Sequence, residues 1–203
     1  SIKRARKISE TDVDPTNYLP STNKNIDEMM MELTKFIAGV NNPYYKQVLT
    51  KLFILRQKEI IGKFDIYHFT NIHKFLFEDI YNFAGLFRSE NIAKGNFRFA
   101  EWEYIEQELI KLLDELKAEK YLEGLTKQEL AKKLAYYMAE LNVLHPFREG
   151  NGRAIREFIR ELAMKNGYEL DLTKTTPTNM LNACIESVVD TSELEEILYK
   201  CLV

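Results

Sequence analysis

The stretch HPFREGNGRAIREFIR, residues 145–160, gathers a histidine, acidic side chains, two glycines and four arginines in one loop and the helix that follows it. Pro146 ends the preceding helix, because a residue before proline disfavours helical geometry. Apolar residues at helical spacing then predict a second helix from about residue 151 to 166, which Gly167 closes. The stretch is therefore expected to join two helices through a short, polar, glycine-rich turn.

Three arginines of the second predicted helix share one face. At about 100° per residue, Arg153, Arg156 and Arg160 fall within a sector of roughly 60°. The opposite face carries Ile155, Phe158, Ile159 and Leu162. This pattern predicts a helix that is anchored in the core and presents aligned guanidinium groups. A charged helix facing solvent would have the same periodicity.

The turn before these arginines supplies what a phosphate group needs. A helix N-terminus offers N–H donors, glycines allow close approach and arginines bind oxyanions, and residues 150–153, Gly-Asn-Gly-Arg, combine all three. His145 can take a proton from a hydroxyl near neutral pH. Glu149 can hold Mg²⁺, which commonly bridges carboxylate and phosphate oxygens. The residues alone thus suggest transfer of a phosphate-containing group to an alcohol.

Length and composition predict one soluble domain. The chain has 203 residues, of which 45% are hydrophobic and 29% charged, enough to bury a core without disulfides or metal. The formal charge of -3 argues against a nucleic-acid partner, so any anion recognition should be local. Cys184 and Cys201 lack the spacing of metal ligands or a redox pair, and we expect both to pack between helices.

The sequence also argues against a membrane protein. No apolar run reaches the roughly 18 residues of a membrane span. The N-terminal sequence SIKRARKISE lacks the apolar stretch of a secretory signal. We therefore expect no membrane partner and a cytoplasmic location.

Helical periodicity dominates the chain, and the predicted fold class is all-α. Residues 1–26 show no sustained period and are expected to form an N-terminal arm, ahead of a domain at 27–203. Further helices are predicted at residues 26–40, 44–62, 65–85, 101–119, 126–144, from 176 onward, and at 191–201. Gly85 is expected to end the third of these, and Thr126 and Glu129 have the spacing of a capping box.

One segment departs from the helical period. Residues 86–100, LFRSENIAKGNFRFA, alternate apolar and polar positions at each end, around Lys94-Gly95-Asn96. This pattern is typical of a β-hairpin. The expected architecture is therefore a helical bundle with one small hairpin.

The opening stretch resembles the signature of the Fic family, H-x-F-x-(D/E)-G-N-G-R-x-x-R. All eight fixed positions match, as His145, Phe147, Glu149, Gly150, Asn151, Gly152, Arg153 and Arg156. Residues 75–100 also resemble the helix and the flap that precede this signature in the family. Over most of residues 64–165, the resemblance implies a Fic-type helical bundle with a small β-hairpin flap.

The resemblance further implies transfer of AMP from ATP to a Ser, Thr or Tyr hydroxyl of a target protein. His145 would be the general base that deprotonates the hydroxyl. Glu149 would hold Mg²⁺ on the α- and β-phosphates. Phe147 would point into the core and fix the loop.

The nucleotide-binding residues follow from the same match. Asn151 and the amides of Gly150 and Gly152 would form an anion hole. Arg153 would contact the phosphates, and Arg156 would hold the γ-phosphate so that the α-phosphorus faces the acceptor. This is catalysis by positioning and charge stabilisation.

The hairpin has a role of its own in this interpretation. An extended peptide can be held at a hairpin edge by main-chain hydrogen bonds while its hydroxyl approaches the base. Phe97, Arg98 and Phe99 are the predicted target-docking edge. A hairpin that only covers the core is the alternative.

The resemblance raises the question of inhibition. Many family members carry a helix with S/T-x-x-x-E-G/N, whose glutamate would pair with Arg156. Thr191 to Glu195 and Ser192 to Glu196 have this spacing, but neither is followed by Gly or Asn. We predict that they are cap and first-turn residues of the last helix. An inhibitor would then be a separate antitoxin chain, another segment, or absent.

Other assignments stay open at this point. Relatives transfer UMP, phosphocholine or phosphate, or remove AMP, and Gly152 with Arg153 favours AMP transfer over the kinase-like form of the motif. The alternative from another class is a helical module that binds nucleotide without catalysis, against which the intact His145 argues. His68 and His73 have no ligand spacing and are predicted to pack in the core or lie at the surface.

Overall fold

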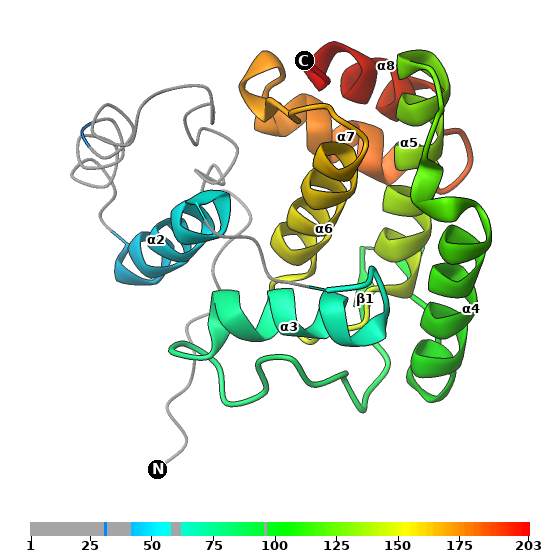
Figure 1. Ribbon diagram of the computed structural model, residues 1–203. Helices are drawn as coiled ribbons and strands as arrows, with labels where there is room; N and C mark the ends of the chain where they lie inside the picture. The colour runs from blue at the N-terminus through cyan, green and yellow to red at the C-terminus, as the bar shows by residue number, and fades with distance from the viewer. Residues whose placement is uncertain (1–30, 32–41, 58–61, 96) are drawn as a thin grey trace.

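The computed structural model describes residues 31, 42–57, 62–95 and 97–203. The predicted arm at 1–26 lies outside these ranges, as does the predicted helix at 26–40 except for Met31. The α-helices are α2 (Pro43–Gln57), α3 (Ile66–Phe77), α4 (Ile105–Ala118), α5 (Lys127–Leu144), α6 (Asn151–Lys165), α7 (Pro177–Glu186) and α8 (Ser192–Cys201). The described ranges also contain the short 3-10 helices η2 (Trp102–Tyr104), η3 (Lys120–Leu122) and η4 (Leu172–Lys174). The strands are β1 (Ala93–Lys94) and β2 (Phe97–Arg98). The predicted all-α class with one hairpin is confirmed (Figure 1).

α6 lies at the centre of the bundle (Figure 1). It packs against α3 and α5, and α5 in turn packs against α4, α7 and α8. The predicted apolar face of α6 is fully buried, at Ile155, Phe158, Ile159 and Leu162. Burial of this face fixes the rotation of the helix, so the opposite face with its arginines has a defined direction.

Local sequence signals set the ends of the helices next to the site. α5 begins with the predicted capping box, in which the Thr126 hydroxyl accepts from the Glu129 N–H and the Glu129 carboxylate accepts from the Thr126 N–H. It ends at Leu144, directly before His145 and Pro146, as predicted. Because both ends are fixed, α5 delivers His145 to a defined place.

The prediction for α3 was wrong at its C-terminal end. The helix stops at Phe77 rather than at Gly85, and residues 78–86 continue as a series of turns. The Gly85 N–H donates to Nδ1 of His73 at 2.9 Å, which folds this segment back over α3. Ile80 and Phe83 still pack against the core, so their apolar spacing mimicked a longer helix.

The hairpin occurs where predicted, with two-residue strands. β1 and β2 pair antiparallel, with Ala93 opposite Arg98. Its two ends are bonded to the end of α5, since the Ala100 N–H donates to the Val143 carbonyl and the Arg88 N–H to the Pro146 carbonyl. These two bonds hold the hairpin beside the loop that contains His145.

The two cysteines pack against the core, as expected. Cys201 is buried in the core and Cys184 is half-buried against it, and both are free thiols. Within the described ranges, each helix is too short or too polar to cross a membrane.

Candidate active site

His145 stands where α5 ends and the signature loop begins. Its backbone is left-handed, with φ 44° and ψ 57°, which costs a non-glycine residue on the order of 1 kcal/mol. Its ring stacks on Phe99 of the hairpin, with centroids 4.0 Å apart, and Nδ1 lies 3.2 Å from the Asn142 carbonyl oxygen. A proton on Nδ1, donated to that carbonyl, leaves the lone pair on Nε2, which is the form that a general base requires.

Asn151 closes the loop between His145 and α6. This side chain is buried, its Oδ1 accepts from the Phe147 N–H at 2.8 Å and its Nδ2 donates to the Phe147 carbonyl at 2.7 Å. Phe147 is fully buried, as the resemblance implied. The Asn151 side chain therefore shapes the loop, and any part in an anion hole falls to its backbone N–H.

The N-terminus of α6 has no side-chain cap. The first backbone hydrogen bond of this helix runs from the Ala154 N–H to the Gly150 carbonyl, so the N–H groups of residues 151–153 precede the intrahelical ladder. Gly150 has φ 84°, and a Cβ at this position would lie 2.5 Å from the Phe77 ring. Glycine is therefore required at the N-cap, and it offers no side chain to cover these donors.

Arg153 is held between two aromatic rings. Its Cζ lies 5.7 Å from the centroid of the Tyr45 ring and 5.1 Å from that of the Phe77 ring. Its Nη1 is buried and has no hydrogen-bond partner. A buried donor without a partner is uncommon, and a fixed guanidinium with a donor to offer suits a phosphate oxygen.

Arginines also line the small pocket next to Arg153. Arg56, Arg156 and Arg160 share it with Arg153, whereas Glu157 is its acidic member. A Cβ at Gly152 would lie 3.2 Å from Nη1 of Arg156, so this glycine leaves room for the Arg156 side chain near the start of α6. The positive lining favours an anion with several charges, such as a polyphosphate.

Arg160 differs from the two arginines of the signature. It is buried and binds Glu157 through two bonds, from Nε at 3.0 Å and from Nη2 at 2.7 Å. Its Nη1 contacts the sulfur of Met164. The three aligned arginines therefore line one pocket, but the bonds to Glu157 distinguish Arg160 from Arg153 and Arg156.

Glu149 has an exposed side chain and a firmly held backbone. The Glu149 carbonyl lies 2.8 Å from Nε2 of His73, whose Nδ1 accepts from the Gly85 N–H, so Nε2 carries the proton. The His73 ring also stacks on Phe147, with centroids 3.7 Å apart. Burial, reinforced by the charge of Arg153, lowers the pKa of His73 to about 4 and keeps the ring neutral.

The sequence predicted that His73 packs in the core or lies at the surface, and its contact with the signature loop was missed. Its partner Glu149 lies 76 residues further along the chain. No local spacing connects the two, and only the docking of α3 against α6 brings them together.

The hairpin places Phe99 against His145 and leaves Arg98 exposed. The Phe99 N–H donates to the Ile92 carbonyl at 3.3 Å, which extends the pairing by one position. Because bonded and outward positions alternate along an antiparallel strand, the backbone of Arg98 faces away from β1. The Arg98 side chain pairs with Glu101 at 2.8 Å.

The first residues around α8 form local contacts, as predicted. The Thr191 hydroxyl donates to Oε1 of Glu195 at 2.7 Å, and the Ser192 hydroxyl donates to Oδ1 of Asp190 at 2.6 Å. These are interactions typical of a helix start. They give no support to an inhibitory role for this segment.

Comparisons with known proteins agree with this geometry. Residues 63–163 match the Fic/DOC family model. The chain is 43% identical over 148 residues to the protein adenylyltransferase VbhT of Bartonella schoenbuchensis, covering 73% of this chain and 31% of VbhT. It is 39% identical over 139 residues to y4lH of Sinorhizobium fredii, named a probable protein adenylyltransferase, covering 67% of this chain and 72% of y4lH.

Solved structures show the same fold. The N-terminal Fic domain of a Bep effector protein from Bartonella quintana, solved with bound ADP, superposes with a TM-score of 0.72 at 28% identity, covering 81% of this chain and 88% of that one. BepC from Bartonella tribocorum, solved with bound AMPPNP, gives a TM-score of 0.71 at 26% identity, covering 82% and 90%. With the signature loop and the hairpin in place, these matches establish that the chain belongs to the Fic/DOC family.

Proposed function

We propose that the chain is a protein adenylyltransferase, which transfers AMP from ATP to a Ser, Thr or Tyr hydroxyl of a target protein. The observation that carries the proposal is a single loop with His145 at one end and the open N-terminus of α6, next to Arg153, at the other. This arrangement sets a base beside an anion site. The relatives named as adenylyltransferases and the neighbours solved with ADP and AMPPNP support the same chemistry.

The reaction is an in-line displacement at the α-phosphorus. The hydroxyl oxygen of the target forms a bond to phosphorus, its proton passes to Nε2 of His145, and the bond to the departing pyrophosphate breaks. The amides of Gly150, Asn151 and Gly152 form the anion hole with Arg153, while Arg156 holds the γ-phosphate. The chain thereby contributes a base, positioning and charge stabilisation.

Glu149 fits a role as the protein ligand of Mg²⁺. The described residues contain no cluster of three or more His, Cys, Asp or Glu side chains that could hold a metal ion. Mg²⁺ in nucleotide sites commonly uses one or two carboxylates together with phosphate oxygens and water. The exposed Glu149 at the edge of the anion site can supply one such carboxylate. When bound, the ion would neutralise charge on the departing phosphates.

Partners and location follow as parts of the proposal. A target peptide would bind along the outward edge of β2, around Phe97, Arg98 and Phe99. An inhibitory antitoxin or segment would act by placing a carboxylate beside Arg156. Two free thiols suit a cytoplasmic protein. The chain spans 31% of the length of VbhT. The activity of the whole protein is therefore also part of this proposal.

The test compares ATP labelled at the α-phosphate with ATP labelled at the γ-phosphate, incubated with the protein and a cell lysate. We expect label from the α-phosphate alone on a protein band. His145→Ala should reduce that label by about 10³-fold or more while Mg-ATP still binds. Label from the γ-phosphate alone would support a kinase, and equal behaviour of wild type and variant would support a nucleotide-binding module.

A further inference from the structure

Arg88 occupies an unusual position at the root of the hairpin. It is 4% exposed, and its guanidinium donates to four backbone carbonyls. Nε bonds to His145 at 2.9 Å, and Nη1 bonds to Glu90 at 2.7 Å. Nη2 bonds to both Ala100 and Leu144.

These bonds join two parts of the molecule. Glu90 and Ala100 flank the hairpin, whereas Leu144 and His145 form the end of α5. Burial lowers the pKa of Arg88, and a buried cation is costly unless its donors are fully hydrogen-bonded. Its hydrogen-bond acceptors are four backbone carbonyls, and the charge of Glu101 opposes the effect of burial on its pKa. Because the four bonds hold carbonyls of two segments, the buried guanidinium fixes the main-chain geometry of both segments.

The main-chain geometry that Arg88 fixes includes that of His145. His145 is left-handed at φ 44° and ψ 57°, and ψ sets the direction of the carbonyl to which Nε of Arg88 is bonded. The same backbone conformation directs the imidazole toward Phe99, whose segment Arg88 holds through Ala100. One guanidinium therefore fixes both the backbone of His145 and the ring on which its imidazole stacks.

We propose that Arg88 is a positioning residue, which holds His145 in its left-handed conformation against the hairpin and so aims Nε2 at the acceptor hydroxyl. The proposal rests on the function inferred above, because His145 is the base of that reaction. Arg88 acts through the backbone and does not touch the nucleotide. Its loss should lower kcat and leave ATP affinity nearly unchanged.

The test uses Arg88→Gln and Arg88→Lys, with Asn166→Ala as a matched control. Nδ2 of Asn166 likewise donates to two backbone carbonyls, those of Tyr121 and Leu162, but at the far end of α6. Circular dichroism and gel filtration check folding, calorimetry gives the Kd for Mg-ATP, and label transfer gives kcat. We expect kcat to fall at least about ten-fold in Arg88→Gln with Kd within about two-fold, and neither to change in the control.

A spectroscopic measurement separates this proposal from the function on which it rests. The chain has three histidines, so ring ¹⁵N–¹H spectra are simple, and His145→Ala identifies the signals of residue 145. In the wild type we expect one tautomer with the proton on Nδ1, and in Arg88→Gln a mixture of tautomers. This result stands even if the wild type transfers no label.

Unchanged His145 signals together with unchanged kcat in a folded Arg88 variant would overturn the proposal. If Arg88→Gln does not fold, Arg88→Lys decides, because one ammonium group cannot span the carbonyls of both segments. We expect it to shift the same signals in the same direction. A wild-type tautomer with the proton on Nε2 would also overturn the proposal.

Discussion

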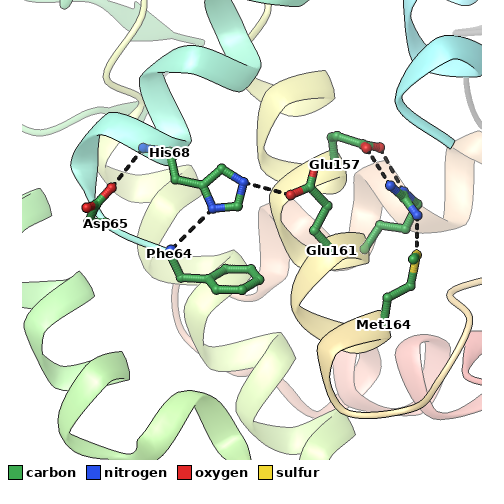
Figure 2. A network of polar contacts seen from close by, with 7 residues as sticks. Phe64, Asp65, His68, Glu157, Glu161 and Met164 are labelled. Atoms are coloured by element: carbon green, nitrogen blue, oxygen red, sulfur yellow. Dashed lines mark hydrogen bonds and ion pairs between the residues drawn. The ribbon is translucent and has the colours of Figure 1, made fainter. Parts of the chain in front are cut away.

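The two halves of α6 use charge in opposite ways. At the N-terminal half, backbone N–H groups precede the helical ladder and Nη1 of Arg153 is buried without a partner. At the C-terminal half, Arg160 binds Glu157 through two bonds, and Glu161 lies 2.7 Å from Nε2 of His68. Figure 2 shows His68 of α3 and Glu161 of α6 facing each other.

If the function proposed above is right, the difference separates a ligand site from a structural network on one helix. On the function proposed above, the polar groups in the N-terminal half would bind a ligand. In the C-terminal half, Arg160 and Glu157 are paired inside the protein, and such a buried pair contributes little net stability but is costly to break. Glu161 lies against His68, although its Oε1 has no hydrogen-bond partner. Substitutions in the first half should therefore change ligand affinity, whereas those in the second should change the free energy of unfolding.

Breaking the Arg160 pair should have the largest effect on stability. Arg160→Met leaves the buried Glu157 carboxylate without its two-bond partner, which we expect to cost about 3–5 kcal/mol of unfolding free energy. Urea denaturation measures this loss. The double variant Glu157→Leu with Arg160→Met removes both charges and should recover most of it. A double variant as unstable as the single one would show that packing, not charge, dominates at this site.

The two glycines that flank α6 provide a matched comparison. Gly150 has φ 84° and Gly167 φ 83°, but a Cβ at Gly150 would lie 2.5 Å from the Phe77 ring, whereas none lies within 4 Å at Gly167. We expect Gly167→Ala to cost about 1 kcal/mol from backbone strain alone. Gly150→Ala should cost about 3 kcal/mol, because the steric conflict adds to that strain. It should also weaken Mg-ATP binding in calorimetry, and equal costs at the two positions would contradict this interpretation.

Arg153→Met should change affinity and not stability. Methionine keeps an unbranched stem but removes the guanidinium, so the cation–π contacts with Tyr45 and Phe77 are lost together with the buried donor that has no partner. These two losses oppose each other in the free energy of unfolding. We expect the Kd for Mg-ATP to rise roughly 30-fold, or about 2 kcal/mol, the typical contribution of a hydrogen bond to a charged group. Urea denaturation without ligand should give an unfolding free energy within about 0.5 kcal/mol of the wild type. A large loss of stability would place Arg153 in the structural network instead.

The sequence predicted correctly the features that depend on local spacing. The capping box at Thr126, the helix end before Pro146 and the apolar face of α6 depend on local spacing, and each was correct. The prediction that α3 ends at Gly85 was wrong. The helix stops at Phe77, and the Gly85 N–H donates to His73 instead.

Long-range partners could not be found from spacing. His73 meets Glu149, and Arg88 meets His145, only after the helices dock. The roles assigned to the signature residues came from family resemblance and remain predictions. The fold adds their placement, with residues 145–150 in the loop and residues 151–156 in the first turns of α6.

The smallest expected effect is the pH dependence of the second half of α6. Burial raises the pKa of Glu161, with Glu157 adding to this effect and His68 and Arg160 opposing it. Oε1 of Glu161 is buried and has no hydrogen-bond partner. A carboxyl whose pKa is higher in the folded state favours folding when protonated. Its contribution is therefore fully present below the unfolded pKa and is lost as pH rises to the folded value.

Glu161→Gln should remove this dependence, because the amide stays neutral and its oxygen can still accept from Nε2 of His68. We expect the variant to match the wild type near pH 4 and to gain stability relative to it at higher pH. The gain should grow by about 1.4 kcal/mol for each pH unit between the two pKa values. Urea denaturation from pH 4 to 8 measures it. A variant less stable than the wild type at pH 8 would show that ionised Glu161 and a charged His68 form a favourable pair, which would make this half of α6 stabilising in its own right.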